Sequence, residues 1–460
     1  MEIKMTYSII HKSQLEVSKR LDAEYYQPEF LAVEKKIKSM PHETLENICK
    51  SLVSFGAYDL TNYIKWVEKG IPFLVAENIK DGFIDYDNVR YIDESVDEIL
   101  KKSRVKENQV LLGMSGSVGE AAIARLLPAK TNSNQDIVKI TLKESFSPYF
   151  LAIFLNSKYG KSQVLRLPVG SVQQHIFLWQ TKSLLVPTFP DSFINEVEQL
   201  YKNALDQSQN SKNTYRQAEQ ILLDELGLAD FEKEMENCPN FSIVNLSEAK
   251  VAHRFDAEYF LPKYETLFSK LRTGKIKKLG DIATVKKGIE TGAAAYQENG
   301  KLFIRVSSIS REELIDKDQK YLSDELYEKL KKNFEPKIGE ILLTKDASPG
   351  VAFAVAEPIE GIICGGILRL IPKERIESEY LSLCINSILG KFQVERDAGG
   401  SIITHWKPEQ VKNLLVPILP IETQRKIAVL VRQSRETRKK AKELLETAKQ
   451  KVEEAIENQK

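Results

Sequence analysis

Two histidines in the same short pattern are the residues best placed for acid–base chemistry. The pattern Gly-Ser-x-x-x-His ends at His175 and again at His405. Histidine ionises near neutral pH and can therefore take or give a proton. Catalysis would also need an acid or a nucleophile beside each histidine, and no matched partner accompanies both of them in the sequence. The pattern therefore favours a structural or loop-ordering role for these histidines over catalysis.

Other catalytic and metal-binding patterns are missing from the sequence. The chain contains no Gly-x-x-x-x-Gly-Lys-[Ser/Thr], no Gly-x-Ser-x-Gly, no His-Glu-x-x-His and no Asp/Asn-Pro-Pro-aromatic motif. Asp191 follows a proline but has no Glu-x-Lys in the next twenty residues, which argues against a nuclease carboxylate cluster. The four cysteines show no paired spacing, and the five histidines do not cluster with them. We expect no metal site, no cofactor bound by this chain, and no catalysis by it alone.

Each histidine pattern belongs to a long segment that occurs twice. "GSVQQHIFLWQTKSLLVPTFP" from Gly170 aligns with "GSIITHWKPEQVKNLLVPILP" from Gly400. Four other pairs keep the same order: "YSIIHKSQLEVSKRLDAEYY" with "FSIVNLSEAKVAHRFDAEYF", "FLVAENI" with "FIRVSSI", "LLGMSGSVG" with "LLTKDASPG", and "NSKYGKSQV" with "NSILGKFQV". The period is much longer than the roughly 20 to 50 residues of a solenoid unit. One domain and its connector have therefore been duplicated.

The sequence pattern within each copy indicates a mixed α/β fold. Short apolar runs alternate with Gly, Asn and Ser, and one or two helical segments lie among them. This pattern predicts an α/β (α+β) domain with a substantial sheet.

A long segment with a helical sequence pattern follows each copy. Residues 191–228 contain no proline, and their first glycine is Gly227. Apolar or small residues recur there near a 3.5-residue spacing, and residues 421–457 repeat the pattern. Each segment predicts a helix of roughly 37 residues, about 55 Å long at 1.5 Å per residue. The positions of the stripe are Val197, Leu200, Ala204, Ser211, Tyr215, Ala218 and Leu222, then Ile427, Leu430, Ser434, Thr437, Ala441, Leu444, Ala448 and Val452.

A single helix with so narrow an apolar stripe cannot bury it, whereas two such helices can bury each other. We expect an internal antiparallel coiled coil; independent dimerisation, or packing of each helix on its own domain, is the alternative. The predicted architecture is two similar α/β domains in a pseudo-two-fold arrangement, separated by the paired helices. The predicted boundaries are 1–190 for the first α/β domain, 191–228 for the central helix, 229–420 for the second α/β domain and 421–460 for the C-terminal helix.

Composition places the chain among ordinary soluble proteins. Its 460 residues are 42% hydrophobic and 28% charged, and no apolar run approaches the length of about 18 residues that spans a bilayer. The N-terminus lacks the apolar stretch of a signal peptide, so a cytoplasmic location is expected. The net charge of +1 counts against nucleic-acid binding, although a neutral total can conceal segregated charge.

The repeated motifs resemble those of a known family, the specificity subunits of type I restriction-modification systems. The likeness rests on the doubled Arg-[Leu/Phe]-Asp-Ala-Glu-Tyr-[Tyr/Phe], on "GEILL" from Gly339, on the doubled Gly-Ser-x-x-x-His…Leu-Leu-Val-Pro…Pro, and on "IETQRKIAVLVRQ". It covers nearly the whole chain. Two features depart from the family pattern: "ENQVLL" from Glu107 replaces a glycine-aspartate turn, and "MSGSVG" differs from "KDASPG". The two recognised sequences should therefore differ.

The resemblance implies a function and a set of partners. Each domain would read one half of a gapped site in double-stranded DNA, and the two helices would set the gap. Two modification subunits would dock beside the helices to methylate adenine, and motor-endonuclease subunits would join to cleave unmodified DNA. S-adenosylmethionine, ATP and magnesium would be bound by those partners, and no membrane would be involved.

Candidate DNA-contacting residues follow from the chemistry of base edges. Arg and Lys favour guanine, Asn and Gln favour adenine, and contacts to phosphates only position the protein. We therefore selected polar residues on glycine-containing loops where the two copies have diverged. They are Ser54, Tyr58, Asn62, Lys65, Asn78, Lys80, Ser115, Ser117, Ser171, Gln173, Gln174 and His175 in the first copy, and Lys287, Thr291, Tyr296, Arg305, Ser307, Ser308, Lys345, Asp346, Ser348, Ser401, Thr404, His405 and Lys407 in the second.

Two alternatives remain open for these residues and for the chain. Arg20 and Arg254 in the doubled motif either contact DNA or, as the sequence favours, pair with Asp22 and Asp256. The rival function is a non-catalytic coiled-coil adaptor that binds protein partners, which the near-neutral charge supports. Replacing Gln173 and Gln174 is predicted to alter one half-site only; equal loss of both half-sites in a folded protein would contradict a division of labour between the domains.

Overall fold

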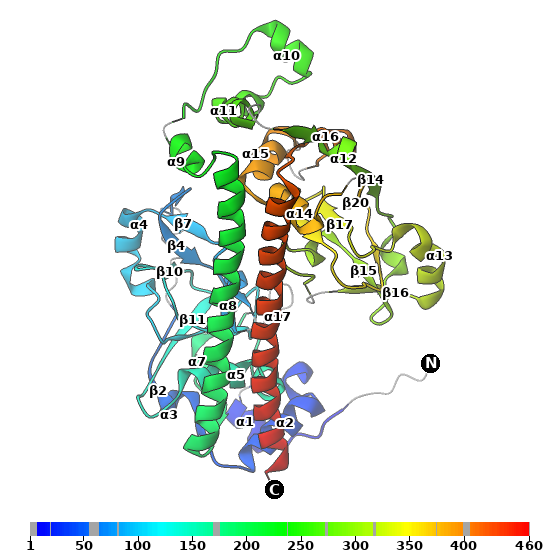
Figure 1. The fold of residues 1–460 in the computed structure, drawn as a ribbon. Helices are drawn as coiled ribbons and strands as arrows, with labels where there is room; N and C mark the ends of the chain where they lie inside the picture. Colours follow the sequence, from blue (N-terminus) through cyan, green and yellow to red (C-terminus); the bar gives the residue numbers. More distant parts are fainter. Residues whose placement is uncertain are drawn as a thin grey trace. The chain divides into compact units, whose positions relative to one another are not determined.

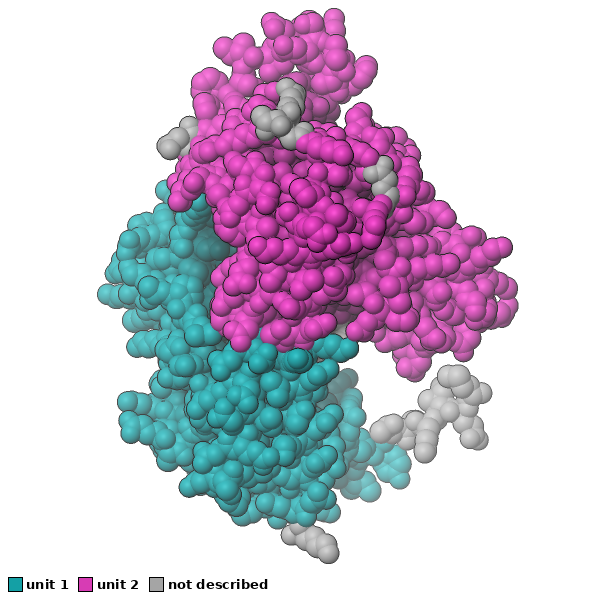
Figure 2. Space-filling view, viewed as in Figure 1, with its two compact units in different colours: residues 1–208, 439–460 teal, residues 209–438 magenta. Residues whose placement is uncertain are grey.

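The chain folds into two compact units of similar construction. The computed structural model describes residues 7–18, 20–54, 64–80, 82–168, 175–236, 238–271, 275–315, 319–373, 375–398 and 405–459. One unit comprises Met1–Ser208 with Lys439–Lys460, and the other comprises Gln209–Arg438 (Figure 2). Among the helices of the described ranges, none is long and apolar enough to cross a membrane. The first and second sequence copies thus lie in different units, called unit 1 and unit 2.

A four-stranded antiparallel sheet forms the centre of each unit. In unit 1 its order is β2 (Cys49–Val53), β11 (Ile137–Leu142), β8 (Val110–Gly113) and β9 (Ala121–Ile123). In unit 2 the same order is formed by β14 (Ala283–Lys287), β20 (Ile367–Pro372), β17 (Ile341–Thr344) and β18 (Ala352–Ala354). Strands β8 and β17 are buried along their whole length, which explains why their sequences are continuous apolar runs.

A smaller mixed sheet accompanies the central sheet in both units. Unit 1 has the order β10 (Asn132–Ser133), β4 (Ile71–Leu74), β7 (Arg90–Ile92) and β3 (Trp66–Val67), and β10 runs parallel to β4. Unit 2 has β16 (Lys320–Leu322), β15 (Lys301–Ile304) and β19 (Gly361–Ile363), with β15 parallel to β19. The remaining strands pair as β1 (His42–Thr44) with β12 (Leu185–Pro187), β13 (Ile276–Lys278) with β21 (Leu415–Pro417), and β5 (Ile79–Lys80) with β6 (Phe83–Ile84).

The shorter helices also occur in matched pairs. Helix α5 (Pro148–Asn156) packs on β8 and β9, and α14 (Ser378–Asn386) packs on β18. The hydroxyl of Ser147 caps α5 by accepting from the Phe150 amide at 3.2 Å. The other helices are α1 (Lys12–Ser18), α2 (Pro28–Lys38), α3 (Leu45–Ile48), α4 (Glu94–Ile99), α6 (Lys158–Leu165) and α7 (Leu178–Thr181) in unit 1, and α9 (Phe231–Glu236), α10 (Leu246–Ala252), α11 (Pro262–Leu271), α12 (Leu279–Ile282), α13 (Asp324–Phe334), α15 (Ile388–Asp397) and α16 (Pro408–Lys412) in unit 2.

The repeated Asn-Ser-x-x-Gly sequence has a packing explanation. Its glycine lies in the first turn of the second helix of each pair. A Cβ on Gly160 would lie 2.1 Å from the Phe154 carbonyl oxygen, and one on Gly390 would lie 2.0 Å from that of Ile385. Only glycine fits so close to a backbone. The motif therefore recurs because both helix junctions need the same close approach.

Two long helices extend through both units. Helix α8 spans Asp191–Glu225 and helix α17 spans Ile421–Asn458 (Figure 1). In unit 1 they run antiparallel: Lys451 pairs with Glu196 at 2.6 Å, and Val197 shares a core with Val452. In unit 2, Leu222 of α8 shares a core with Ile427 of α17. Most positions of the predicted stripe are buried and the antiparallel pairing is confirmed, but Leu200, Leu430, Thr437 and Leu444 are only partly buried, whereas Tyr201, Val431 and Leu445, which were not predicted, are buried.

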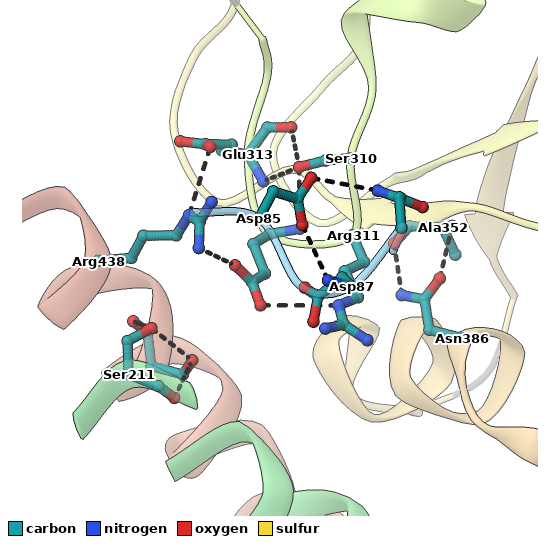
Figure 3. A network of polar contacts seen from close by, with 12 residues as sticks. Asp85, Asp87, Ser211, Ser310, Arg311, Glu313, Ala352, Asn386 and Arg438 are labelled. Carbon is teal, nitrogen blue, oxygen red and sulfur yellow. Dashed lines mark hydrogen bonds and ion pairs between the residues drawn. The ribbon is translucent and has the colours of Figure 1, made fainter. Parts of the chain in front are cut away.

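Two serines replace apolar residues in the stripe of unit 2. Ser211 donates its hydroxyl to the Ser434 carbonyl oxygen at 2.7 Å, and Ser434 donates to that of Ser211 at 2.8 Å (Figure 3). Both side chains are buried, and their small size lets the helix backbones approach. Nearby, Arg438 of α17 pairs with Glu312 at 2.7 Å and with Glu313 at 3.3 Å. The serine bonds join the two long helices, and the Arg438 pairs satisfy the buried carboxylate of Glu312.

The structure confirms the mixed α/β class and the two long paired helices. The helix predicted over residues 191–228 ends slightly earlier, at Glu225, and a left-handed Gly227 follows it. The pseudo-two-fold relation between the copies and the sequence-based domain boundaries stay predictions.

Candidate functional site

A tight loop after the central strand β17 brings together three candidate residues of unit 2. Inside the loop, the Thr344 hydroxyl donates to the Ser348 carbonyl oxygen at 2.6 Å, and the Ser348 amide donates to that of Asp346 at 2.7 Å. Ala347 has a φ of 61°, a left-handed conformation that is uncommon for a residue with a side chain. Backbone bonds thus hold this loop in one shape.

Asp346 lies between two cationic or ionisable side chains. Its Oδ1 is 2.7 Å from Nδ1 of His405, and its Oδ2 accepts from the ammonium of Lys345. Burial disfavours the charged carboxylate, but the hydrogen bonds from His405 and Lys345 outweigh burial and hold the pKa of Asp346 below its ordinary value. The Lys345 side chain is largely buried, whereas the His405 ring is 58% exposed. His405 therefore presents its outer edge to solvent while its inner nitrogen is held.

The corresponding loop of unit 1 has the same backbone contacts. The Ile176 amide donates to the Met114 carbonyl oxygen at 3.1 Å, as the Trp406 amide donates to that of Lys345 at 2.8 Å. Gly116 has a φ of 73° at the position of Ala347. The loop sequences "MSGSVG" and "KDASPG" therefore build one conformation from different residues.

The side chains of the two loops differ in charge. Met114 and Ser115 of unit 1 occupy the positions of Lys345 and Asp346, so His175 has no carboxylate at the matched position. The His175 ring instead meets Phe177 edge to face, with centroids 5.3 Å apart. An acid thus accompanies only one of the two repeated histidines at this position.

A groove of about 460 Å³ opens beside His175 in unit 1. Phe177 is 46% exposed and Trp179 is 65% exposed beside it, which is unusual for aromatic side chains. Burial raises the pKa of Asp136, which directly precedes β11, and the charge of His175 opposes that rise. The groove is lined by Ser54, Met114, Gln135, His175, Phe177, Leu178, Trp179 and Lys182.

Two candidate residues form matching turns, one after β4 in unit 1 and one after β15 in unit 2. The Asn78 side-chain oxygen accepts from the Val75 amide at 2.9 Å, and the Ser308 hydroxyl accepts from the Arg305 amide at 3.2 Å. Both side chains are buried, and so are those of Ser115 and Ser117. The side-chain oxygens of Asn78 and Ser308 therefore already accept hydrogen bonds from backbone amides of these turns.

The other candidates lie nearer the surface. Lys65, Lys287, Ser307, Ser348 and Lys407 are exposed, and so is Lys80, which pairs with Asp85 at 2.6 Å. Thr291, Tyr296 and Arg305 are partly buried, and the Tyr296 ring packs 5.4 Å from that of Phe303.

Seven candidates lie outside the described residues, and so do the two glycines of the histidine pattern. Whether any candidate, described or not, contacts a ligand is untested, and their role stays a prediction. The residues outside the described ranges are Tyr58, Asn62, Ser171, Gln173, Gln174, Ser401 and Thr404, with Gly170 and Gly400.

Six of the eight groove-lining residues were not among the sequence-based candidates, Met114 and Leu178 included. Gln135, Phe177, Trp179 and Lys182 were not selected because the search followed polar residues on glycine-containing loops. A signal was available, since "FLW" directly follows His175 and contains two large aromatic residues in a segment that returns to the surface.

The doubled motif at the start of each half forms the ion pair that the sequence favoured. Arg20 reaches Asp22 through two bonds of 2.6 Å, and Arg254 reaches Asp256 through bonds of 2.6 and 2.5 Å. Each arginine also donates to a carbonyl oxygen of its own unit, that of Leu167 at 3.0 Å for Arg20. The predicted Arg–Asp ion pair is therefore confirmed in both halves.

Comparisons with known proteins bear on the repeated halves. The model of the family "Type I restriction modification DNA specificity domain" matches residues 272–449. The Type I restriction enzyme EcoBI specificity subunit of Escherichia coli is 25% identical over 144 residues, which span 30% of this chain and 30% of that protein. The matched stretch thus covers less than a third of that relative.

Solved structures are also similar over most of the chain. The S subunit of a type I restriction-modification system from M. genitalium is 14% identical, with 90% of this chain and 94% of that chain covered and a TM-score of 0.39. The HsdS subunit from Thermoanaerobacter tengcongensis is 14% identical, with 91% and 96% covered and a TM-score of 0.28. At such TM-scores the assignment depends on the sequence matches. Residues 272–449 are therefore similar to the type I DNA specificity domain, and the motifs doubled in this chain recur in its other half.

Proposed function

We propose that this chain is the DNA-recognition subunit of a type I restriction-modification complex and has no catalytic activity of its own. Each unit reads one half of a gapped double-stranded site. Two modification subunits methylate adenine there, and motor-endonuclease subunits cleave unmodified DNA. The partners bind S-adenosylmethionine, ATP and magnesium.

One observation carries this proposal. The loops at residues 113–119 and 344–350 share their backbone bonds but differ in the charge, size and polarity of their side chains. Such a pair suits a protein that presents different base-reading groups from one scaffold, because base edges are distinguished by donors, acceptors and methyl groups. The two half-sites would then differ in sequence.

The first test is a map of methylated adenine in cells that carry this chain with its modification subunit. Matched cells that lack only this chain are the control. A gapped two-part motif that disappears with the chain supports the proposal. Absence of any chain-dependent motif, with an active modification subunit shown to be present, contradicts it.

A protein adaptor is the second candidate function, and exposed apolar residues support it. Tyr7 and Phe241 are 78% and 70% exposed at matched positions in the two halves, and Ile9 and Ile243 are 82% and 97% exposed. Exposed apolar groups at such matched sites suit protein docking. These surfaces fit partner subunits as well as an adaptor, so salt dependence separates the two functions. Affinity of a DNA reader for duplex DNA falls steeply with salt, because each phosphate contact releases counterions.

A further inference from the structure

Asp346 is held too firmly to act as an ordinary exposed loop carboxylate. Its two oxygens face different partners, His405 on one side at 2.7 Å and Lys345 on the other. The carboxylate also lies close to Gly366: a Cβ on that glycine would be 3.4 Å from Oδ2 of Asp346. The carboxylate is about three-quarters buried. Its hydrogen-bonding capacity is therefore directed largely into the protein.

His405 is the exposed member of this group. Its neighbour Trp406 is buried and pinned by the backbone bond to Lys345, which fixes the position of the histidine backbone. The carboxylate then fixes the ring, because an ionised oxygen accepts a hydrogen bond from Nδ1–H and leaves Nε2 on the open side. In the neutral ring Nε2 is an acceptor.

We propose that Asp346 is a positioning residue that orients His405 for base reading by unit 2, has its charge balanced by Lys345, and does not itself contact DNA. This inference rests on the proposed function and specifies it for one loop. An outward imidazole acceptor suits the exocyclic amino group of adenine or cytosine, which both bases display in the major groove. A free carboxylate at this place would repel phosphates, and its pairing with Lys345 removes that obstacle.

Unit 1 supports the same division of roles. Ser115 stands where Asp346 stands in unit 2, and Met114 replaces Lys345, so both residues are replaced together; the carboxylate whose pKa His175 influences is that of Asp136, at the position of Gly366. The histidine of unit 1 is instead packed against Phe177. The carboxylate thus accompanies the lysine that it pairs with, as expected of a group that acts through its neighbours.

The test compares Asp346→Ser, His405→Ala and the double variant of the full chain by mapping methylated adenine in cells with the modification subunit. Asp346→Ser reproduces the residue found in unit 1. If Asp346 acts through His405, both single variants relax the same position in one half of the motif by about tenfold, the scale of one good base contact. The double variant should be no more relaxed there than His405→Ala. Asp346→Asn, whose amide oxygen can still accept from Nδ1, should retain more of the preference.

The possible results separate this inference from the function beneath it. A wild-type chain without any chain-dependent motif overturns the proposed function, and the positioning role with it. If the wild-type chain gives a gapped motif, three results overturn the positioning role alone: no change in Asp346→Ser, changes at different positions in the two single variants, or an effect of the double variant equal to the product of the single effects. Equal relaxation of both half-sites would also overturn it, because that pattern indicates a general structural defect.

Discussion

The same buried position on the central sheet carries different charged groups in the two units. In unit 2, Arg369 of β20 lies opposite Leu342 and binds Glu340 through bonds of 2.8 and 2.7 Å. In unit 1, Lys139 of β11 lies opposite Leu111, and its ammonium donates to the Ser133 hydroxyl at 2.9 Å. Gln109 stands where Glu340 stands in unit 2. A buried ion pair in one copy thus corresponds to a buried lysine and an amide in the other.

One part of this arrangement is nevertheless shared. The Gln109 side chain accepts from the Lys106 amide at 2.8 Å, and the Glu340 side chain accepts from the Lys337 amide at 3.0 Å. The backbone contact is retained while the charge is not. The fold therefore requires a side-chain acceptor for the backbone amide at this position, whereas the charge of that side chain can differ between the copies.

The largest expected effect comes from breaking the buried pair of unit 2. Glu340→Gln leaves the Arg369 guanidinium buried without its carboxylate, which should cost about 3–5 kcal/mol. Hydrogen exchange of the β17 and β20 amides measures this loss better than a melt of the whole chain, because two units need not unfold together.

The matched control is Gln109→Glu in unit 1. This variant brings a carboxylate toward Lys139 and should leave unit 2 unaffected. A loss below about 1 kcal/mol in Glu340→Gln would show that the pair is solvated like a surface ion pair.

The repeated asparagines should behave alike in the two units. Asn156 bonds both backbone groups of Ala121, at 3.1 and 2.7 Å, and Asn386 bonds those of Ala352 at 2.9 and 2.7 Å (Figure 3). Truncation to alanine should cost about 1–3 kcal/mol for each buried group left unsatisfied. Exchange rates of the β9 and β18 amides test this, and clearly unequal losses would contradict a shared framework.

Much of the fold could be predicted from the sequence, because its strongest signals repeat. The apolar stripe of the long helices and the Arg20–Asp22 pair each depend on residues close together in sequence, and both occur twice. Local spacing was therefore sufficient to predict them.

The site was harder to predict, since its geometry depends on distant segments. Asp346 and His405 are 59 residues apart and meet only because a strand and a returning segment adopt adjacent backbone positions. Burial of Asn78 and Ser308 was also missed, because a polar residue in a loop can turn inward to cap a turn. The exposed Trp179 was overlooked because aromatic residues are usually assigned to the core.

The lysine of unit 1 gives a pH-dependent prediction. Burial lowers the pKa of Lys139 to about 8. Between about pH 8 and its ordinary pKa of 10.5, the unfolded chain binds the proton that the folded chain has released, so the stability of unit 1 should rise with pH across that window.

Lys139→Met should remove this rise and stabilise unit 1 near pH 7 by about 1–3 kcal/mol, because no charge need then be buried. The difference in β11 amide exchange between wild type and variant isolates this lysine from other groups that titrate at high pH. If the difference in β11 amide exchange between wild type and variant does not change between about pH 8 and 10.5, water reaches the ammonium of Lys139.

The smallest effect is expected at the doubled Arg-Asp motif. The side chains of Asp22 and Asp256 are 38% and 39% exposed, so Asp22→Asn and Asp256→Asn should each cost no more than about 1 kcal/mol at pH 7. Hydrogen bonds from Arg20 and Arg254 lower the pKa of both carboxyls, so their contribution is present above the ordinary pKa of 3.8 and is lost as pH falls below it. Amide exchange in α2 and α11 at pH 7 and pH 3 measures that loss. Both variants should keep the methylation motif of the wild-type chain; a relaxed half-site in either one would show that the arginine of that unit also contacts DNA.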